Sequence, residues 1–164
     1  MSRDLLVKIL LWYNVLSLGI WVGGTVYQMA VIVPLWSASP PESVRAFFQG
    51  TAYMTTISRF FGPVTQVTRG LPLFILAAVA WKYNVSPWVL ACAATMAFGI
   101  IMTRVYVYPM NAILFERSGA DLTPDAVRAL VRSWILADRV RFAIMSGGYL
   151  CLLRAFSMPL AAPG

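Results

Sequence analysis

The chain has 164 residues, of which 60% are hydrophobic and only 12% are charged, and its formal net charge is +7. A soluble domain usually has about 25% charged residues, so this composition excludes an ordinary water-soluble globule. The basic excess does not indicate a nucleic-acid partner, because no basic run with interleaved aromatic residues occurs in the sequence. The composition instead predicts an integral membrane protein with the lipid bilayer as its first partner.

Histidine is absent, and the chain has two cysteines, Cys92 and Cys151. The absence of histidine excludes haem or metal sites built on imidazole, and it excludes Ser-His and Cys-His catalytic pairs. The two cysteines lie far apart inside apolar stretches and have no metal-ligand spacing, so we interpret them as small packing residues. The sequence therefore predicts no bound metal and no cofactor.

Apolar stretches of roughly 20 residues recur along the chain, which is the length that a helix needs to cross a bilayer. Backbone polar groups have no water partner in lipid, and the stretches lack the alternation of a barrel strand, so helices are favoured. The predicted fold class is an all-α membrane protein, a single domain over residues 1–164 that forms a four-transmembrane-helix bundle. Its spans are predicted at about 5–33, 63–83, 87–115 and 124–156.

The first span follows a short basic start without a cleavage site, so we interpret it as an uncleaved helix. Pro34 is expected to end this helix, since proline cannot continue one. Residues 42–60 read as an amphipathic helix between the first two spans, with Phe47 and Phe48 on one face and Arg45 and Gln49 on another. This segment is too polar to span, so it is expected to lie on the membrane surface or to cap the bundle.

The fourth predicted helix is too long for one crossing. Thr123 is its expected N-cap and Pro124 its first residue, and about its first dozen residues should project from the membrane. Four spans place both termini on one side. The positive-inside rule then predicts termini on the non-cytoplasmic side of a bacterial inner membrane. The basic residues near the opposite side are Arg45, Arg59, Arg117, Arg128 and Arg132.

Each predicted span carries one polar stripe at helical spacing, and lipid rejects such stripes, so they are expected to face one another. The stripes are Asn14, Trp21, Thr25 and Gln28; Thr65, Gln66 and Arg69; Arg104, Tyr108 and Asn111; and Trp134, Asp138 and Arg141. They converge at one level near the predicted cytoplasmic boundary. Arginines at a boundary often reach to the head groups, which is the interpretation given to Arg59, Arg139 and Arg154. A buried positive excess at the shared level would need an anion to be tolerated.

Two short motifs, "YPMN" at 108–111 and "WILADRVR" at 134–141, resemble the anthrone-oxygenase-like family of small membrane proteins. The glycine-containing first span that ends "GGTVYQMAVIVP" at 23–34 is similar to that family as well. The resemblance covers most of the chain and implies a four-helix membrane bundle. It implies that Asn111, Trp134 and Arg141 take the motif positions, while Asp138 stands where the family usually has His or Asn.

The resemblance implies a cofactor-free oxygenase of polycyclic phenols or quinols. In that hypothesis Asn111 and Arg141 bind the substrate oxygen, Trp134 stacks on the ring, and Asp138 orients Arg141 or acts as the base. Ligand-binding roles are also predicted for Arg69, Arg104, Gln28, Thr25 and Tyr108. The second hypothesis is a non-catalytic protein that binds a lipid or quinone head group or serves as an accessory subunit of a larger membrane complex. We favour the second, since the chain departs from the family at Asp138 and has no histidine base.

Overall fold

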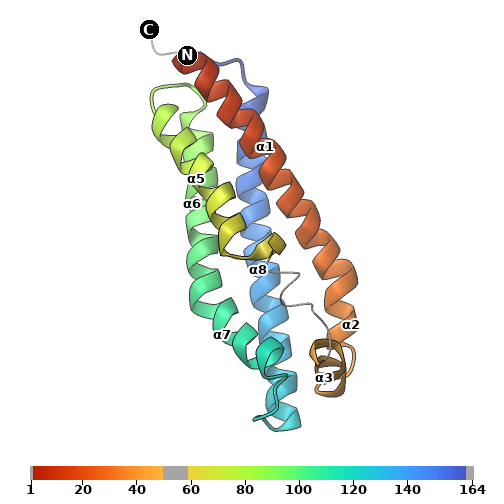
Figure 1. Cartoon of the computed structure of the whole chain (residues 1–164). Coiled ribbons are helices and arrows are strands. Elements are labelled where there is room, and N and C mark those ends of the chain that lie inside the picture. The colour runs from red at the N-terminus through yellow and green to blue at the C-terminus, as the bar shows by residue number, and fades with distance from the viewer. Residues whose placement is uncertain (1, 50–58, 162–164) are drawn as a thin grey trace.

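The computed structural model describes residues 2–49 and 59–161, and every regular element in these ranges is a helix. This confirms the all-α prediction. Figure 1 shows an elongated bundle with both ends of the chain at one end and α2, α3 and α7 at the other. The elements are α1 (Arg3–Tyr27), α2 (Val33–Ser37), α3 (Glu42–Phe48), α5 (Pro63–Val79), α6 (Ser86–Met102), α7 (Tyr108–Asn111) and α8 (Pro124–Ser157), with π-helical turns at Gln28–Ile32, Thr103–Val107 and Ala112–Glu116.

Two continuous helices of the described chain are long and apolar enough to cross a membrane. The first joins α1 and α2 over Arg3–Ser37, and the second joins α6 and α7 over Ser86–Glu116. At 35 and 31 residues they are about 52 and 46 Å long. Both therefore exceed the roughly 30 Å hydrocarbon core of a bilayer.

The prediction that Pro34 ends the first helix is wrong, because the helix continues to Ser37. A π-helical turn, Gln28–Ile32, comes just before the proline, and the N–H of Val33 donates to the carbonyl of Gln28, five residues back. The same arrangement precedes Pro109, where the N–H of Tyr108 donates to the carbonyl of Thr103. In both places the proline enters a helix whose hydrogen-bond register has already changed, so the chain keeps its helical course.

The segment predicted as an amphipathic helix over 42–60 is helical at α3, and its residues 50–58 lie outside the described residues. Val44 and Phe48 of α3 are buried. The Phe48 ring stacks on Phe115 at 4.3 Å between centroids and lies 5.8 Å from Trp36. The apolar face of α3 thus packs on the bundle, which is the arrangement expected if this segment caps the bundle.

The other helix boundaries differ little from the predicted ones, apart from the second. That helix ends at Val79 and not near Tyr83, and Tyr83 donates a hydrogen bond to Asp4 at 2.5 Å from the following turn. The start of α8 is confirmed: the Thr123 hydroxyl accepts from the N–H of Ala126 at 3.4 Å, and Pro124 is the first helical residue.

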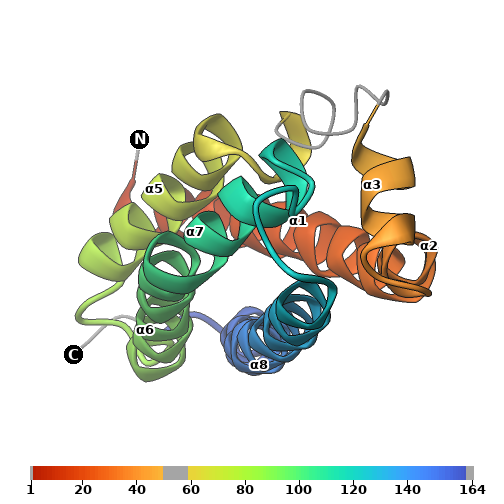
Figure 2. The same ribbon diagram turned by 90° about the horizontal axis from the view of Figure 1, so that it is seen from below.

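Helix α5 is much shorter than the continuous helices beside it, which are Arg3–Ser37, Ser86–Glu116 and α8. It has 17 residues, about 26 Å, whereas α8 has 34 residues, about 51 Å. Toward the termini α1, α5, α6 and α8 enclose one apolar core, with α8 against α1 and α6 and α5 against the same two helices (Figures 1 and 2). Toward the other end a second core forms around Trp36, Phe48, Phe115 and Trp134. The two cores are separated by buried polar residues, which are Thr25, Gln28, Thr103, Asp138 and Arg141.

A hydrogen bond from α1 compensates for the proline inside α5. Pro72 has no N–H, so the carbonyl of Thr68, four residues earlier, lacks its ordinary helical donor. The Tyr13 hydroxyl donates to that carbonyl at 2.9 Å. This contact satisfies a backbone acceptor that would otherwise face an apolar surrounding, and it joins α1 to α5.

We expect Tyr13→Phe to lower the free energy of unfolding in detergent by about 1 kcal/mol, because it removes this bond. Tyr27→Phe is the matched control, since Tyr27 is exposed on the same helix. In a Pro72→Ala background the restored N–H can donate to Thr68, so Tyr13→Phe should cost less there. Thermal unfolding followed by circular dichroism measures the parent protein, the three single variants and the double variant. An equal cost of Tyr13→Phe in both backgrounds would contradict this account.

Candidate functional site

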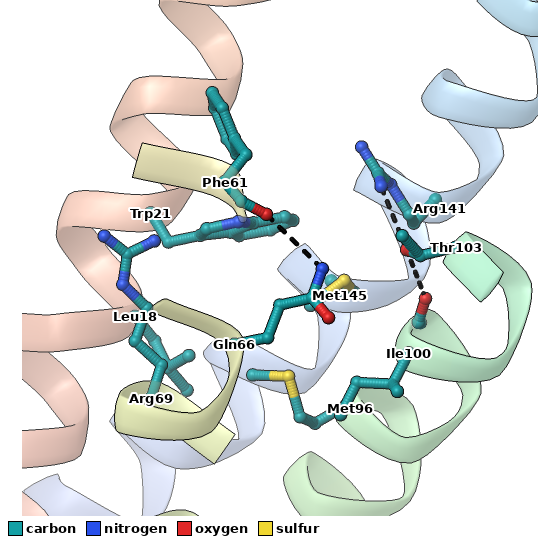
Figure 3. Close-up of a pocket in the computed structure, with 11 residues that line it drawn as sticks. Leu18, Trp21, Phe61, Gln66, Arg69, Met96, Ile100, Thr103, Arg141 and Met145 are labelled. Atoms are coloured by element: carbon teal, nitrogen blue, oxygen red, sulfur yellow. Dashed lines mark hydrogen bonds between the residues drawn. The ribbon is translucent and has the colours of Figure 1, made fainter. Parts of the chain in front are cut away.

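A cleft lies where α5 begins, between the two apolar cores. Its empty volume is about 490 Å³ including the open mouth, and the inner space that can hold the centre of a water molecule is about 50 Å³. Figure 3 shows the polar residues that line it on α5, on α8 and on the continuous helix Ser86–Glu116, which is called the third long helix below. Its lining consists of Leu18, Trp21, Phe61, Gln66, Arg69, Met96, Gly99, Ile100, Thr103, Arg141 and Met145.

Arg141 is the buried charge of the cleft, with 9% of its surface exposed. It forms an ion pair with Asp138, one helical turn earlier on α8. Its Nη1 donates to the Thr103 hydroxyl at 3.0 Å, and that hydroxyl donates to the carbonyl of Gly99 at 2.7 Å (Figure 3). These bonds fix the guanidinium against the third long helix and neutralise its charge within the protein.

The pair retains unused hydrogen-bonding capacity. In the part of the chain that the structure describes, neither Asp138 Oδ2 nor Arg141 Nε has a hydrogen-bond partner, although both atoms are buried. Buried polar atoms are costly to leave unpaired. A polar group in or beside the cleft could use these atoms.

Arg69 of α5 also lines the cleft, and its guanidinium lies toward α1, on the side away from Arg141 (Figure 3). Its Nη1 lies 3.4 Å from the carbonyl of Phe60, and its guanidinium carbon lies 4.7 Å from the centre of the Phe60 ring. The ion pairs of the described residues do not include it. Among the described residues, the contacts of the Arg69 guanidinium are thus a long hydrogen bond and an aromatic face. The lining of the cleft contains two guanidinium groups, and the Asp138 carboxylate that pairs with Arg141 lies outside it.

Gln66 and Trp21 complete the polar end of the cleft. Gln66 Nε2 donates to the Tyr108 hydroxyl at 2.9 Å and lies 3.3 Å from the carbonyl of Phe61. Tyr108, predicted as a ligand residue, is therefore reached through Gln66 and does not line the cleft itself. The sequence already places Gln66 one helical turn before Arg69, and this spacing is the signal that could have identified it as a residue of the cleft.

The predicted residues Trp134 and Asn111 lie together but outside the cleft. The Trp134 indole N–H donates to Asn111 Oδ1 at 2.7 Å, and Trp134 is only 2% exposed. Its ring packs 5.1 Å from Trp36 in the second core. Asp138 lines a separate small hollow with Trp134. The structure thus gives Trp134 a packing role, and the aromatic residues at the cleft are Trp21 and Phe61.

Three other predicted residues are also outside the cleft lining. Arg104 is exposed and lies with its guanidinium carbon 5.6 Å from the Tyr108 ring centre. Thr25 is fully buried and its hydroxyl donates to the carbonyl of Trp21 at 2.9 Å. Gln28 is buried in the polar layer. Thr103, which sequence analysis missed, takes the inward place on the third long helix.

No protein-family model, curated protein or solved structure matches this chain. Among the described residues, no group of three His, Cys, Asp or Glu side chains could hold a metal ion.

We expect Arg141→Ala to lower the free energy of unfolding by about 3–5 kcal/mol, because it leaves the Asp138 carboxylate buried without its partner. Arg139→Ala, two residues away and exposed, should change it by no more than about 0.5 kcal/mol. Asp138→Asn added to Arg141→Ala should recover part of the loss, because it removes the uncompensated charge. Melting of the variants in one detergent measures these differences. Equal melting of the two single arginine variants would contradict the assigned role.

Proposed function

We propose that this chain is a four-span integral membrane protein whose cleft binds the anionic head group of a lipid without catalysing a reaction. The observation that carries the proposal is an open cleft whose described lining contains two guanidinium groups, Arg69 and Arg141, and no carboxylate, since Asp138, the partner of Arg141, lies outside that lining. Such a site has a net positive charge inside an apolar bundle. An anion with oxygen acceptors would neutralise it and accept hydrogen bonds from the guanidinium groups of Arg69 and Arg141.

The outward face of all four long helices supports the membrane assignment. Large apolar side chains are exposed along each of them, which water would disfavour and lipid would accept. They include Leu5, Ile9, Trp12, Leu16 and Ile20 on α1; Val64, Val67, Leu71 and Phe74 on α5; Trp88, Leu90, Phe98 and Ile101 on α6; and Leu136, Val140 and Leu150 on α8.

The level of the cleft supports a head-group site. On α8 the exposed side chains change from Asp125, Arg128 and Arg132 to Leu136 and Val140, and the exposed Arg139 between these two is long enough to reach back toward the boundary. A membrane boundary between these groups puts Arg141 about one to two helical turns, or about 8 Å, inside it. Lipid head groups and the polar end of a quinone lie near this depth. The positive-inside rule makes this boundary the cytoplasmic one, in a bacterial inner membrane with both termini on the far side.

The size of the inner space favours a small head. One water molecule needs about 10–15 Å³ of such inner space. The 50 Å³ of the cleft therefore holds about four groups of the size of a water molecule. A phosphate or carboxylate group meets that limit. A tricyclic phenol does not, and a quinone would enter only by one carbonyl edge.

The oxygenase alternative has less support. Trp134 and Asn111, which would bind its substrate, are hydrogen-bonded to each other and buried in the second core. Asp138, which would be its base, is outside the cleft lining. The residues of the motif therefore serve the packing of the bundle in this interpretation.

We expect phosphatidic acid to bind the purified protein in detergent, as observed by native mass spectrometry and by a rise in melting temperature. Diacylglycerol is the matched control, because it has the same tails without the phosphate. Arg69→Gln should weaken binding about tenfold, as expected for a hydrogen bond to a charged group. Arg104→Gln should not, since Arg104 is exposed outside the cleft. Equal binding of diacylglycerol, or stronger binding of a short-chain ubiquinone, would contradict the phosphate assignment.

A further inference from the structure

The side chain of Arg69 borders two hollows. One is the cleft, and the other is a groove on the outer surface between α1 and α5, lined by Tyr13, Leu16, Ser17, Ile20 and Arg69, with an empty volume of about 530 Å³. In the described part of the chain, Arg69 alone is common to both linings. Arg69 is therefore the described residue at which the interior cleft and the outer groove meet.

The groove suits a hydrocarbon chain and offers little to a polar head. Leu16 and Ile20 are 59% and 61% exposed, and Ser17 provides the small side chain that leaves the recess open. The Tyr13 hydroxyl is already bonded to the carbonyl of Thr68. From Tyr13 to Ile20 the groove follows about 10 Å of helix, enough for several methylene groups.

Phe60 and Arg69 close the gap between the two hollows. A Cβ atom added at Gly24 of α1 would collide with the Phe60 ring, so that ring lies directly on the α1 backbone. The guanidinium of Arg69 covers the same ring. The Phe60–Arg69 pair fills the space between α1 and α5, and no carboxylate of the described residues holds the arginine in that position.

We infer that the gap between α1 and α5 is a lateral entrance from the membrane and that the Arg69 side chain is its gate. The occupant is a lipid with an anionic head and at least one hydrocarbon tail. The head lies in the cleft between Arg69 and Arg141, and the tail lies in the groove along Tyr13, Leu16, Ser17 and Ile20. The inference rests on the proposed function and adds to it the route and the position of the tail. The charge of Arg69 at the inner end of the groove is what selects an anionic lipid over a neutral one or over a helix of a second copy.

The position of the tail can be tested with phosphatidic acid that carries a photoreactive diazirine in one acyl chain. After irradiation of the detergent-solubilised protein, peptide mass spectrometry should locate the adducts at Tyr13, Leu16 or Ile20. Adducts spread evenly over other exposed apolar residues, such as Trp88, Leu90 and Leu150, would overturn the tail position. Phosphate-dependent binding in the same sample would then still support the proposed function, so the two ideas fail separately.

The groove can also be filled by substitution. Ser17→Trp should weaken binding of long-chain phosphatidic acid about tenfold, because the indole occupies the space of several methylene groups. It should leave binding of glycerol phosphate, which has no tail, unchanged. Ala94→Trp is the matched control on the exposed surface of α6. Unchanged long-chain binding in Ser17→Trp would overturn the inference, and so would an equal loss in both tryptophan variants. If Ser17→Trp fails to fold, Ser17→Leu provides the smaller obstruction.

Discussion

The buried ion pair between Asp138 and Arg141 is the interaction on which the middle of this structure depends. Both residues lie on α8 one turn apart, so the pair forms within one helix and needs no neighbour to align it. Its contact with Thr103 then fixes the third long helix at the level of the pair. Because a buried charge without a partner is strongly unfavourable, this level tolerates little rearrangement. The pair also neutralises Arg141 within the protein, which leaves Arg69 as the charge of the cleft that a ligand must balance.

The cleft exists because one helix is short. The three other long helices run past the start of α5, and the space beyond it is bordered by Phe60, Phe61 and the side chains of a polar layer. A fourth helix of full length would fill that space with apolar side chains, as α5 does nearer the termini. At the far end of the bundle a cluster of large aromatic rings, with Trp36 and Phe115 in contact, forms the second core. A polar cleft between two dry cores is the result.

The sequence alone predicted the helices, the start of α8 at Thr123 and the polar character of one face of each long helix, because these follow from hydropathy, capping and a period of 3.6 residues. It did not predict the π-helical turns, since no residue pattern marks them. The consequence is clearest at Arg104. A π turn over Thr103–Val107 adds one residue and rotates the residues after it relative to Arg104 by about 100° around the axis, whereas Thr103 keeps the α-helical register of Gly99. Arg104 is exposed, and Thr103 takes the buried place beside Arg141. Trp134 was placed on the correct face, but the sequence could not show that Asn111 would already satisfy its indole N–H.

The proline in α5 gives the proposed gate a rigid frame. Pro72 removes the donor for Thr68, and the Tyr13 hydroxyl replaces it, which ties α1 to α5 at the residue immediately before Arg69. The backbone at the proposed entrance is therefore held by a hydrogen bond between the two helices. Among the described residues, the Arg69 side chain is held by the Phe60 ring and a 3.4 Å contact with the Phe60 carbonyl. Motion at this point thus costs least in the arginine side chain, whose rotamer changes need no separation of helices. In the proposed mechanism, such an entrance would open for a head group that attracts the guanidinium and stay closed to neutral lipid, since neutral lipid offers nothing in exchange for the contacts with Phe60.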